Sequence, residues 1–291
     1  VRTSAGRGPS GPLPRVRGGA PYGRRPERDG GRVTRRQRQR LLRGLLYATA
    51  VLVVVALAGV ADWALLRRNF LDLDIAATMF PDVLLVAARN TIVYTALAFT
   101  FGLVLGLVLA LMRLSSIPPY RWFATVYIEV FRGLPALLTI FLVGFGIPIA
   151  FQTRWPVLVQ ITLGLGIVAA AYMAETIRAG IEAVPRGQME AARSLGMSRG
   201  RAMTSIIIPQ GFRIIVPPLT NELVLLIKDT SLLFVLGTTP ATKELTKFGR
   251  DILTSRANAT PLIVVGVVYL MITVPLTQLV AVLERRNARS R

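Results

Sequence analysis

The chain has 291 residues, of which 53% are hydrophobic and 17% are charged, and its formal net charge is +20. This balance is too apolar for an ordinary soluble domain and is typical of a protein with several membrane spans. The chain has no cysteine and no histidine, which excludes disulfides, thiol nucleophiles, imidazole bases and the usual zinc and haem ligands. It also has no G-x-x-x-x-G-K-[ST] loop for nucleotide phosphates, so any ATP that drives it must be hydrolysed by another chain.

The N-terminal segment, residues 1–44, is predicted to be a disordered, arginine-rich cytoplasmic tail. Residues 1–43 hold thirteen arginines and two acidic residues, and their glycine- and proline-rich composition lacks the periodic apolar residues that a fold needs. Attraction to anionic lipid head groups is the favoured interpretation. Nucleic-acid binding is the alternative, and it is disfavoured because Tyr22 is the only aromatic residue of the tail that could stack on a base.

Six apolar runs follow, each near or above the ~20 residues that a helix needs to cross hydrocarbon. They cover residues 45–66, 83–112, 121–151, 156–174, 212–237 and 261–283. The first run is expected to be an extra, uncleaved N-terminal helix, with a signal peptide as the alternative. Gly133 with Pro135, and Pro217 with Pro218, are expected to break the third and fifth spans. The arginine-rich tail favours a topology with both termini in the cytoplasm.

Two shorter features lie within this plan of spans. In the second span, Gly102, Gly106 and Ala110 recur every four residues, which predicts close approach of a neighbouring helix. Between the fifth and sixth spans, residues 238–260 are predicted to be an outer loop with a short amphipathic helix around residues 243–253.

Residues 185–210, between the fourth and fifth spans, are predicted to form two short helices with a break. This stretch carries Glu190 and Arg193, so it cannot lie in hydrocarbon. Gly196 suits the left-handed position that ends the first helix, and Ser198 suits the N-cap of the second.

The first of these helices has an apolar stripe at three-residue spacing, formed by Met189, Ala192 and Leu195. We expect this stripe to face a partner, and we expect Pro209 to end the second helix. A short, capped, half-apolar helix on a cytoplasmic loop is a docking element.

Several motifs point to one family. In the loop they are Glu190-Ala191-Ala192, Gly196, Ile206, Ile208 and Pro209, and in the flanking sequence Phe131-Arg132-Gly133-Leu134-Pro135, Ala171-Tyr172-Met173-Ala174-Glu175, Gly187-Gln188, Pro209-Gln210 and Lys228-Asp229-Thr230-Ser231-Leu232. The loop residues resemble the EAA loop of binding-protein-dependent ABC importer permeases, and the flanking residues resemble the polar amino-acid branch of that family. The resemblance covers roughly residues 83–286. Leu134 is a departure, because the family usually has threonine at that position.

The resemblance implies an all-α integral membrane protein with a type I (MetI-like) ABC importer permease core at residues 83–286. It implies a multi-pass subunit of a bacterial cell membrane that carries a polar amino acid delivered by an extracytoplasmic solute-binding protein and is not itself an enzyme. Its expected partners are a dimer of ABC ATPase subunits, which binds the ATP, a second permease subunit, identical or homologous, and membrane lipids. No cofactor, metal or nucleic acid is expected on this chain.

The same resemblance assigns roles to residues. The residues expected to couple the permease to the ATPase are Glu190, Ala191, Ala192, Gly196, Ile206 and Pro209. Polar and ionisable side chains inside spans are costly, and the resulting candidates for the substrate pathway are Arg132, Glu175, Asn221, Glu222, Lys228 and Asp229. A purely structural ion pair is the alternative for Lys228 and Asp229, because adjacent residues on a helix point apart.

Two other functions remain open from the sequence. A secondary transporter would couple to protons or sodium and usually shows internal repeats around broken helices, which this chain lacks. A membrane-anchored basic adaptor would use the arginine-rich tail and would leave the spans and the loop at residues 185–210 unexplained.

Overall fold

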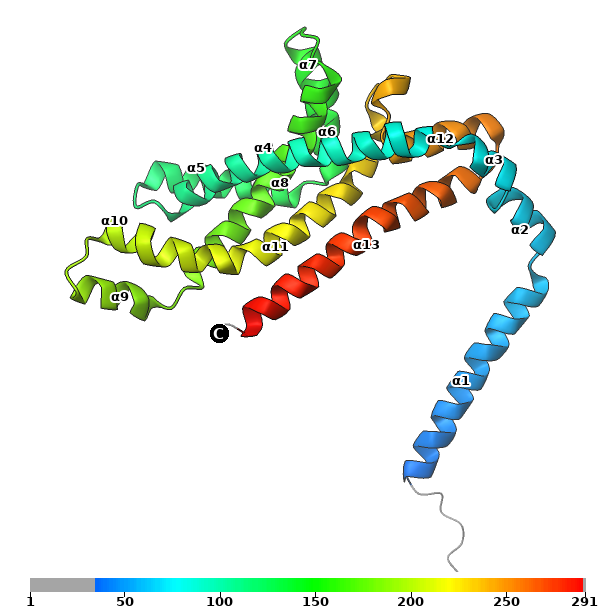
Figure 1. The fold of residues 1–291 in the computed structure, drawn as a ribbon, viewed down its shortest axis with the longest axis horizontal. Coiled ribbons are helices and arrows are strands. Elements are labelled where there is room, and N and C mark those ends of the chain that lie inside the picture. Colours follow the sequence, from blue (N-terminus) through cyan, green and yellow to red (C-terminus); the bar gives the residue numbers. More distant parts are fainter. Residues whose placement is uncertain (1–34, 290–291) are drawn as a thin grey trace, which may run out of the picture. The chain divides into compact units, whose positions relative to one another are not determined.

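A computed structural model describes residues 35–289, and every regular element in that range is a helix (Figure 1). Most of the predicted disordered tail, residues 1–34, lies outside the described residues. The prediction of disorder is wrong for residues 35–44, because they form the start of a helix. Contacts divide the chain into two units, residues 1–61 and residues 62–291. The first unit contains one described helix, α1 (Arg35–Val60).

Five described helices are long and apolar enough to cross a membrane. They are Arg38–Val60, Val83–Leu114, Val157–Glu182, Arg199–Val235 and Thr260–Arg285. The pair Pro118–Gly133 and Ala136–Ala150 gives a sixth span if its two parts are counted as one. The prediction of six spans therefore holds only with the bent pair included.

The first predicted span ends earlier than expected. Helix α1 ends at Val60, and a second helix, α2 (Trp63–Phe70), begins after Asp62. The carboxylate of Asp62 accepts a hydrogen bond from the backbone N–H of Leu65 at 2.9 Å, which is the N-cap arrangement that starts a helix. The prediction that one helix continues to residue 66 is therefore wrong, because a capping aspartate separates the two helices.

The second unit is built on the contact between α4 (Arg89–Leu114), which follows the π-helical turn η1 (Val83–Ala88), and α8 (Val157–Glu182). A Cβ added to Gly102 would lie 3.0 Å from the Cβ of Ala169, and a Cβ added to Gly106 would lie 3.0 Å from the carbonyl oxygen of Ala170. The two backbones are thus as close as glycine permits. The prediction that the small residues of the second span are a packing device is confirmed.

The third predicted span is bent by 107° between α5 (Pro118–Gly133) and the following helices. The bend is followed by α6 (Ala136–Phe141), the π-helical turn η2 (Leu142–Gly146) and α7 (Ile147–Ala150). The predicted interruption at Gly133 and Pro135 is confirmed.

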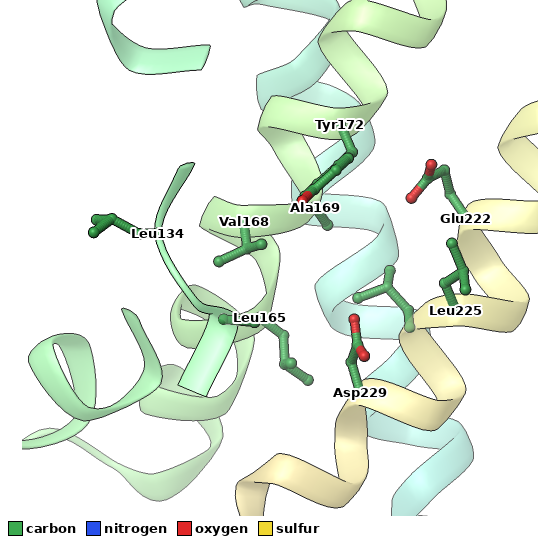
Figure 2. A pocket seen from close by; sticks show the side chains of 10 residues that line it. Leu134, Leu165, Val168, Ala169, Tyr172, Glu222, Leu225 and Asp229 are labelled. Atoms are coloured by element: carbon green, nitrogen blue, oxygen red, sulfur yellow. The ribbon is translucent and has the colours of Figure 1, made fainter. Parts of the chain in front are cut away.

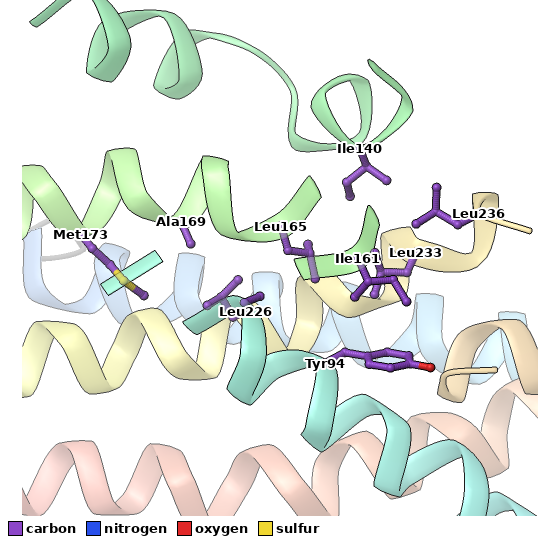
Figure 3. Close-up of a cluster of buried hydrophobic side chains, with 10 residues drawn as sticks. Tyr94, Ile140, Ile161, Leu165, Ala169, Met173, Leu226, Leu233 and Leu236 are labelled. Carbon is purple, nitrogen blue, oxygen red and sulfur yellow. The ribbon is translucent and has the colours of Figure 1, made fainter. Parts of the chain in front are cut away.

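Helix α6 is fixed by the largest hydrophobic cluster of the second unit. Figure 3 shows Ile140 of α6 near Ile161 and Leu165 of α8 and near Leu233 and Leu236 at the end of the fifth span. Ile140, Ile161 and Leu233 are almost completely buried. The part of the chain after the bend is therefore held against α8 rather than left free.

The fifth span is continuous where a break was predicted. Helix α11 (Ile208–Asp229) runs through Pro217 and Pro218, so the prediction of a break there is wrong. A proline fixes φ near the helical value even though it removes a backbone donor. The side chain of Ile215, which packs directly on Gly180 of α8, supports the helix just before the prolines.

The segment between the fifth and sixth spans contains η4 (Thr230–Val235), η5 (Pro240–Thr242) and α12 (Leu245–Arg256), followed by α13 (Thr260–Arg289). The predicted amphipathic helix is confirmed as α12. The side-chain amide of Asn90 donates hydrogen bonds of 2.9 Å to the carbonyls of Ala241 and Lys243, which ties this segment to α4. Figure 1 shows α12 and α3 (Leu73–Thr78) at one end of the second unit and α9 (Arg186–Ser194) and α10 (Arg199–Ala202) at the other.

A buried carboxylate anchors the start of α12. Glu244 is 1% exposed, and it accepts hydrogen bonds from the backbone N–H groups of Thr246 at 2.5 Å and Lys247 at 2.6 Å. The hydroxyl of Tyr269 on α13 donates a third bond of 3.3 Å. Burial raises the pKa of Glu244 to about 7, although these hydrogen bonds favour the ionised form.

The α4–α8 contact makes a stability prediction. Gly106→Val should lower the free energy of unfolding by about 1–3 kcal/mol, because the added side chain meets backbone atoms that cannot turn aside. The measurement is thermal unfolding of the detergent-solubilised protein. Gly266→Val on α13 is the matched control, because a Cβ there meets nothing within 4 Å. Equal losses in both variants would contradict the role of the close contact.

Glu244 makes a prediction about pH. Its folded-state pKa of about 7 lies above the ordinary value of 4.5, so its contribution to stability is present below pH 4.5 and is lost as the pH rises through about 7. Glu244→Gln removes this titration. The unfolding midpoint of the variant should therefore rise relative to the unaltered protein between pH 5 and pH 8, by an amount equivalent to roughly 3 kcal/mol at most. Glu190→Gln, at an exposed glutamate, is the matched control, and an unchanged difference across this range would overturn the prediction.

Candidate functional site

The loop between α8 and α11 forms two short helices, α9 (Arg186–Ser194) and α10 (Arg199–Ala202). Gly196 has φ +82°. Its N–H donates to the carbonyl of Arg193 at 3.0 Å, and the N–H of Met197 donates to the carbonyl of Ala192 at 3.1 Å. This pair of bonds is the Schellman motif, which satisfies the last carbonyls of a helix. The predicted left-handed glycine is confirmed.

Side chains fix the turn from both sides. The guanidinium of Arg193 donates a 2.9 Å hydrogen bond to the carbonyl of Met197. Ser198 is the N-cap of α10, as predicted, and its hydroxyl accepts a 3.3 Å bond from the N–H of Arg201. Residues 185–210, called the α9–α10 segment below, therefore have a defined shape.

The predicted apolar stripe of α9 does not face outward as a unit. Ala192 is 2% exposed and faces the interior of the second unit, whereas Leu195 is 84% exposed. Met189 is half-buried. The interpretation of all three as a partner-facing stripe is wrong, because the small Ala192 side chain is covered by the chain itself. The outward surface of α9 includes Glu190 and Leu195.

Pro209 begins a helix instead of ending one. The segment after α10 passes through a π-helical turn, η3 (Met203–Ile207), directly into α11, with Pro209 in the first turn of α11. At that place the missing N–H of proline costs little. Ile206 is half-buried and Ile207 is buried. This part of the motif therefore supports the junction between the α9–α10 segment and the span.

A cavity of about 240 Å³ lies between α8, α11 and the bend between α5 and α6. Its lining includes Leu134, Ala136, Leu165, Val168, Tyr172, Glu222, Leu225 and Asp229. Glu222 and Asp229 lie on the same face of α11. Figure 2 shows their carboxylates directed into the space opposite Tyr172 of α8. The cavity therefore combines mostly apolar walls with two acidic groups.

Arg132 places a positive charge beside this cavity. Its guanidinium lies 5.7 Å from the centre of the Tyr172 ring, within the range of a cation–π contact. It also interacts electrostatically with Glu222. Of the predicted pathway residues, the structure thus brings together Arg132, Glu222 and Asp229.

The other three candidates lie elsewhere. Asn221 is exposed and is not part of the cavity lining. Lys228 points away from Asp229 and lines a second groove with Ser231 and Tyr269, as the geometry of adjacent helix residues requires. Glu175 pairs with Arg178 on its own helix and with Arg113 of α4.

Sequence reasoning did not assign two residues that matter here. Tyr172 lies within the family motif at residues 171–175, yet nothing in the sequence shows that its ring faces a cavity and an arginine. Arg113 follows an apolar run and gives no signal of its pairing with Glu175, 62 residues away. Among the described residues, no group of three or more histidine, cysteine, aspartate or glutamate side chains could hold a metal ion.

Comparison with known proteins identifies the family. The profile of the "Binding-protein-dependent transport system inner membrane component" family matches residues 102–289. The chain belongs to this family. It is similar to the arginine transport system permease protein ArtQ of Bacillus subtilis (strain 168), with 34% identity over 222 residues, 74% of this chain and 98% of ArtQ. It is also similar to the probable glutamine ABC transporter permease protein GlnM of the same organism, with 37% identity over 215 residues, 69% of this chain and 91% of GlnM.

A solved structure agrees with this assignment. An amino acid ABC transporter crystallised with histidines matches with a TM-score of 0.68 and 36% identity, over 74% of this chain and 99% of that chain. The predictions of an all-α, type I permease core and of a multi-pass inner membrane component are confirmed. The permease is thus a membrane subunit of a transport system, in a family of transporter subunits rather than enzymes.

The Schellman turn of this permease makes a local prediction. Gly196→Ala adds a Cβ that meets nothing within 4 Å, so its cost comes from the positive φ alone, on the order of 1 kcal/mol. The amide of Met197 should therefore exchange with solvent about fivefold faster. Gly200→Ala is the matched control, because Gly200 has equally open surroundings without a positive φ. Equal exchange in the two variants, measured by hydrogen–deuterium exchange, would rule out the strain.

Proposed function

We propose that this permease moves an amino acid across a bacterial cell membrane, with ATP hydrolysed by a separate pair of ATPase subunits. An extracytoplasmic solute-binding protein delivers the amino acid, and a second permease chain, identical or homologous, completes the pathway. The observation that carries the proposal is the α9–α10 segment, an exposed turn of defined shape between two spans of a permease of this family. This chain itself needs no cofactor.

The proposed coupling site is the exposed face of the α9–α10 segment. Glu190, Ala191 and Leu195 are exposed there, and Gly196 sets the angle between the two helices. Behind this surface Ala192 is buried and Ile206 is half-buried, and Pro209 lies in the first turn of α11, where the segment meets the span. A docking ATPase would therefore meet a polar and apolar surface backed by a fixed frame.

A continuous helical path supports transmission of movement. The run from Arg199 to Val235 includes α10, η3, α11 and η4 without an extended interruption. It joins the α9–α10 segment to Glu222 and Asp229 at the cavity. Displacement of the segment would therefore be passed to the cavity carboxylates by a helix. ATP binding would shift the population between two arrangements of the cavity, as does any ligand that binds one of two states more tightly.

The charges of the cavity favour a cationic amino acid as substrate. Arg132 can receive the α-carboxylate of a bound amino acid, and one of the two acidic residues, Glu222 or Asp229, can receive the α-ammonium group. One carboxylate is then left over, and a positively charged side chain would neutralise it. One relative is named for arginine and another of similar identity for glutamine. Their names therefore do not distinguish the two substrates, and the charge of the cavity is the more specific indication.

We also propose that the α9 end of the second unit faces the cytoplasm, with both termini of the chain on that side. Arg186, Arg193, Arg199 and Arg201 are exposed at that end, and arginine marks the cytoplasmic side of membrane proteins. The exposed arginines at the start of α1 fit a cytoplasmic N-terminus, where anionic lipids would attract them.

Transport in proteoliposomes tests the function and the substrate together. The permease should copurify with its ATPase, and it should take up radiolabelled arginine in the presence of ATP and the solute-binding protein. Asp229→Asn should lower arginine uptake about tenfold, the loss expected for one charged hydrogen bond, and should make glutamine a better competitor.

Asp251→Asn is the matched control, because Asp251 of α12 pairs with Lys243 and Lys247 and does not line the cavity. Unchanged preference for arginine over glutamine in Asp229→Asn would overturn the cationic substrate. Uptake that needs neither ATP nor an ATPase would overturn the function itself and favour a secondary transporter.

A further inference from the structure

Five charged side chains form a connected ladder at the α9 end of the second unit. They are Glu129 of α5, Arg113 of α4, and Glu175, Arg178 and Glu182 of α8. None of them lines the cavity, and none belongs to the exposed surface of the α9–α10 segment. The ladder lies between the cavity and the α9–α10 segment.

Glu175 is the centre of the ladder. One carboxylate oxygen accepts a 2.8 Å hydrogen bond from Nη1 of Arg113 and a 3.1 Å bond from Nε of Arg178. The other oxygen accepts from Nη2 of Arg178. Two arginines therefore hold one carboxylate, one from each side of the α4–α8 contact, in a two-pronged geometry that restricts rotation.

The partial burial of the central pair distinguishes it from a surface ion pair. The side chains of Arg113 and Glu175 are 21% and 25% exposed. Glu129, which lies 3.7 Å from the same Arg113, is 64% exposed. Exposed ion pairs at such distances contribute little to stability. Removal of one partner from a shielded pair leaves the other charge without compensation.

One end of the ladder reaches the α9–α10 segment. Arg178 pairs with Glu182, the last residue of α8, one turn further along the helix. Only Ala183 and Val184 separate Glu182 from Pro185, where the α9–α10 segment begins. Val184 is buried, so a shift of that segment would be passed to the end of α8.

The centre of the ladder acts on the cavity wall through Arg132. Arg132 interacts electrostatically with both Glu175 and Glu222, and its guanidinium lies over the ring of Tyr172 in the cavity wall. Arg132 is followed directly by the 107° bend, in which Leu134 forms part of that wall. A change in the position of Glu175 therefore changes the electrostatic field at the residue that starts the bend.

We propose that Glu175, held by Arg113 and Arg178, is a positioning residue that links the α9–α10 segment to the bend at the cavity wall. Movement of the segment shifts the end of α8 and, with it, the carboxylate that attracts Arg132. The bend between α5 and α6 is the element that takes up two arrangements, and it is biased from the α9–α10 segment through Glu182 and Glu175. The inference rests on the proposed function, because it assigns a route to the coupling between ATP and substrate.

The alternative is a static brace that only holds α4 to α8. A brace would affect thermal stability and membrane abundance, and it would leave intact the dependence of the cavity on ATP. A positioning residue would change that dependence even in protein that is folded and abundant. The experiment must therefore compare coupling with stability in the same variants.

The first measurement is ATP hydrolysis in proteoliposomes, with and without loaded solute-binding protein. Arg113→Gln and Glu175→Gln should each lower the ratio of stimulated to unstimulated hydrolysis about tenfold, within the usual range of coupling between sites. The double variant should be no worse than either single one, because both remove the same interaction. Glu129→Gln is the matched control, since it removes a carboxylate from the same Arg113 at an exposed position, and its ratio should not change.

The second measurement needs no stimulation by the binding protein. The chain has no cysteine, so Leu134→Cys introduces a single thiol into the cavity wall. Its rate of modification should differ with and without ATP in the otherwise unaltered complex, and Glu175→Gln should remove that difference.

The possible outcomes separate the interpretations. A stimulation ratio and an ATP-dependent labelling difference that both persist in folded, abundant Glu175→Gln would overturn the inference and leave a static brace. Additive losses in the double variant would also overturn the link between the two residues. Failure of the unaltered permease to assemble with an ATPase would instead overturn the proposed function, and the ladder would then have no coupling to transmit.

Discussion

The close approach of α4 and α8 is the constraint on which the rest of the structure depends. Lipid tails are as apolar as leucine side chains, so two membrane helices gain little from burying large apolar groups against each other. Gly102 and Gly106 instead allow backbone-to-backbone contact with α8. With α8 fixed at the centre, other helices pack on its remaining glycines, as Ile140 of α6 does on Gly164 and Ile215 of α11 does on Gly180.

The cost of charge in hydrocarbon explains how functions are distributed along α8. Its apolar part carries Gly164 at the contact with α6 and the ring of Tyr172 at the cavity. Its last two turns carry Glu175, Arg178 and Glu182, each paired with an opposite charge. One helix thus connects the packing centre, the cavity and the α9–α10 segment. Its apolar residues lie where charge would be costly, and its charged residues lie near its end.

Local rules succeeded where a few neighbouring residues decide the outcome. The left-handed Gly196, the N-cap Ser198, the interruption at Pro135 and the amphipathic α12 follow from short stretches of sequence. The same rules failed where distant segments compete with them. Pro217 and Pro218 did not break α11, which packs on α8 beside them, and Ala192 did not face a partner, because it was already covered within its own chain.

By itself, the sequence determined the family, the all-helical membrane fold and the position of the α9–α10 segment. These follow from long apolar runs, from glycine and proline chemistry and from ordered motifs, which are properties of contiguous residues. Only the tertiary structure decided that Glu222 and Asp229 share a cavity with Tyr172, that Lys228 faces a different groove, and that Arg113 holds Glu175. The physical reason is that helical periodicity fixes which face a residue occupies along its own helix, whereas the partner of that face is set by how helices far apart in the sequence pack together.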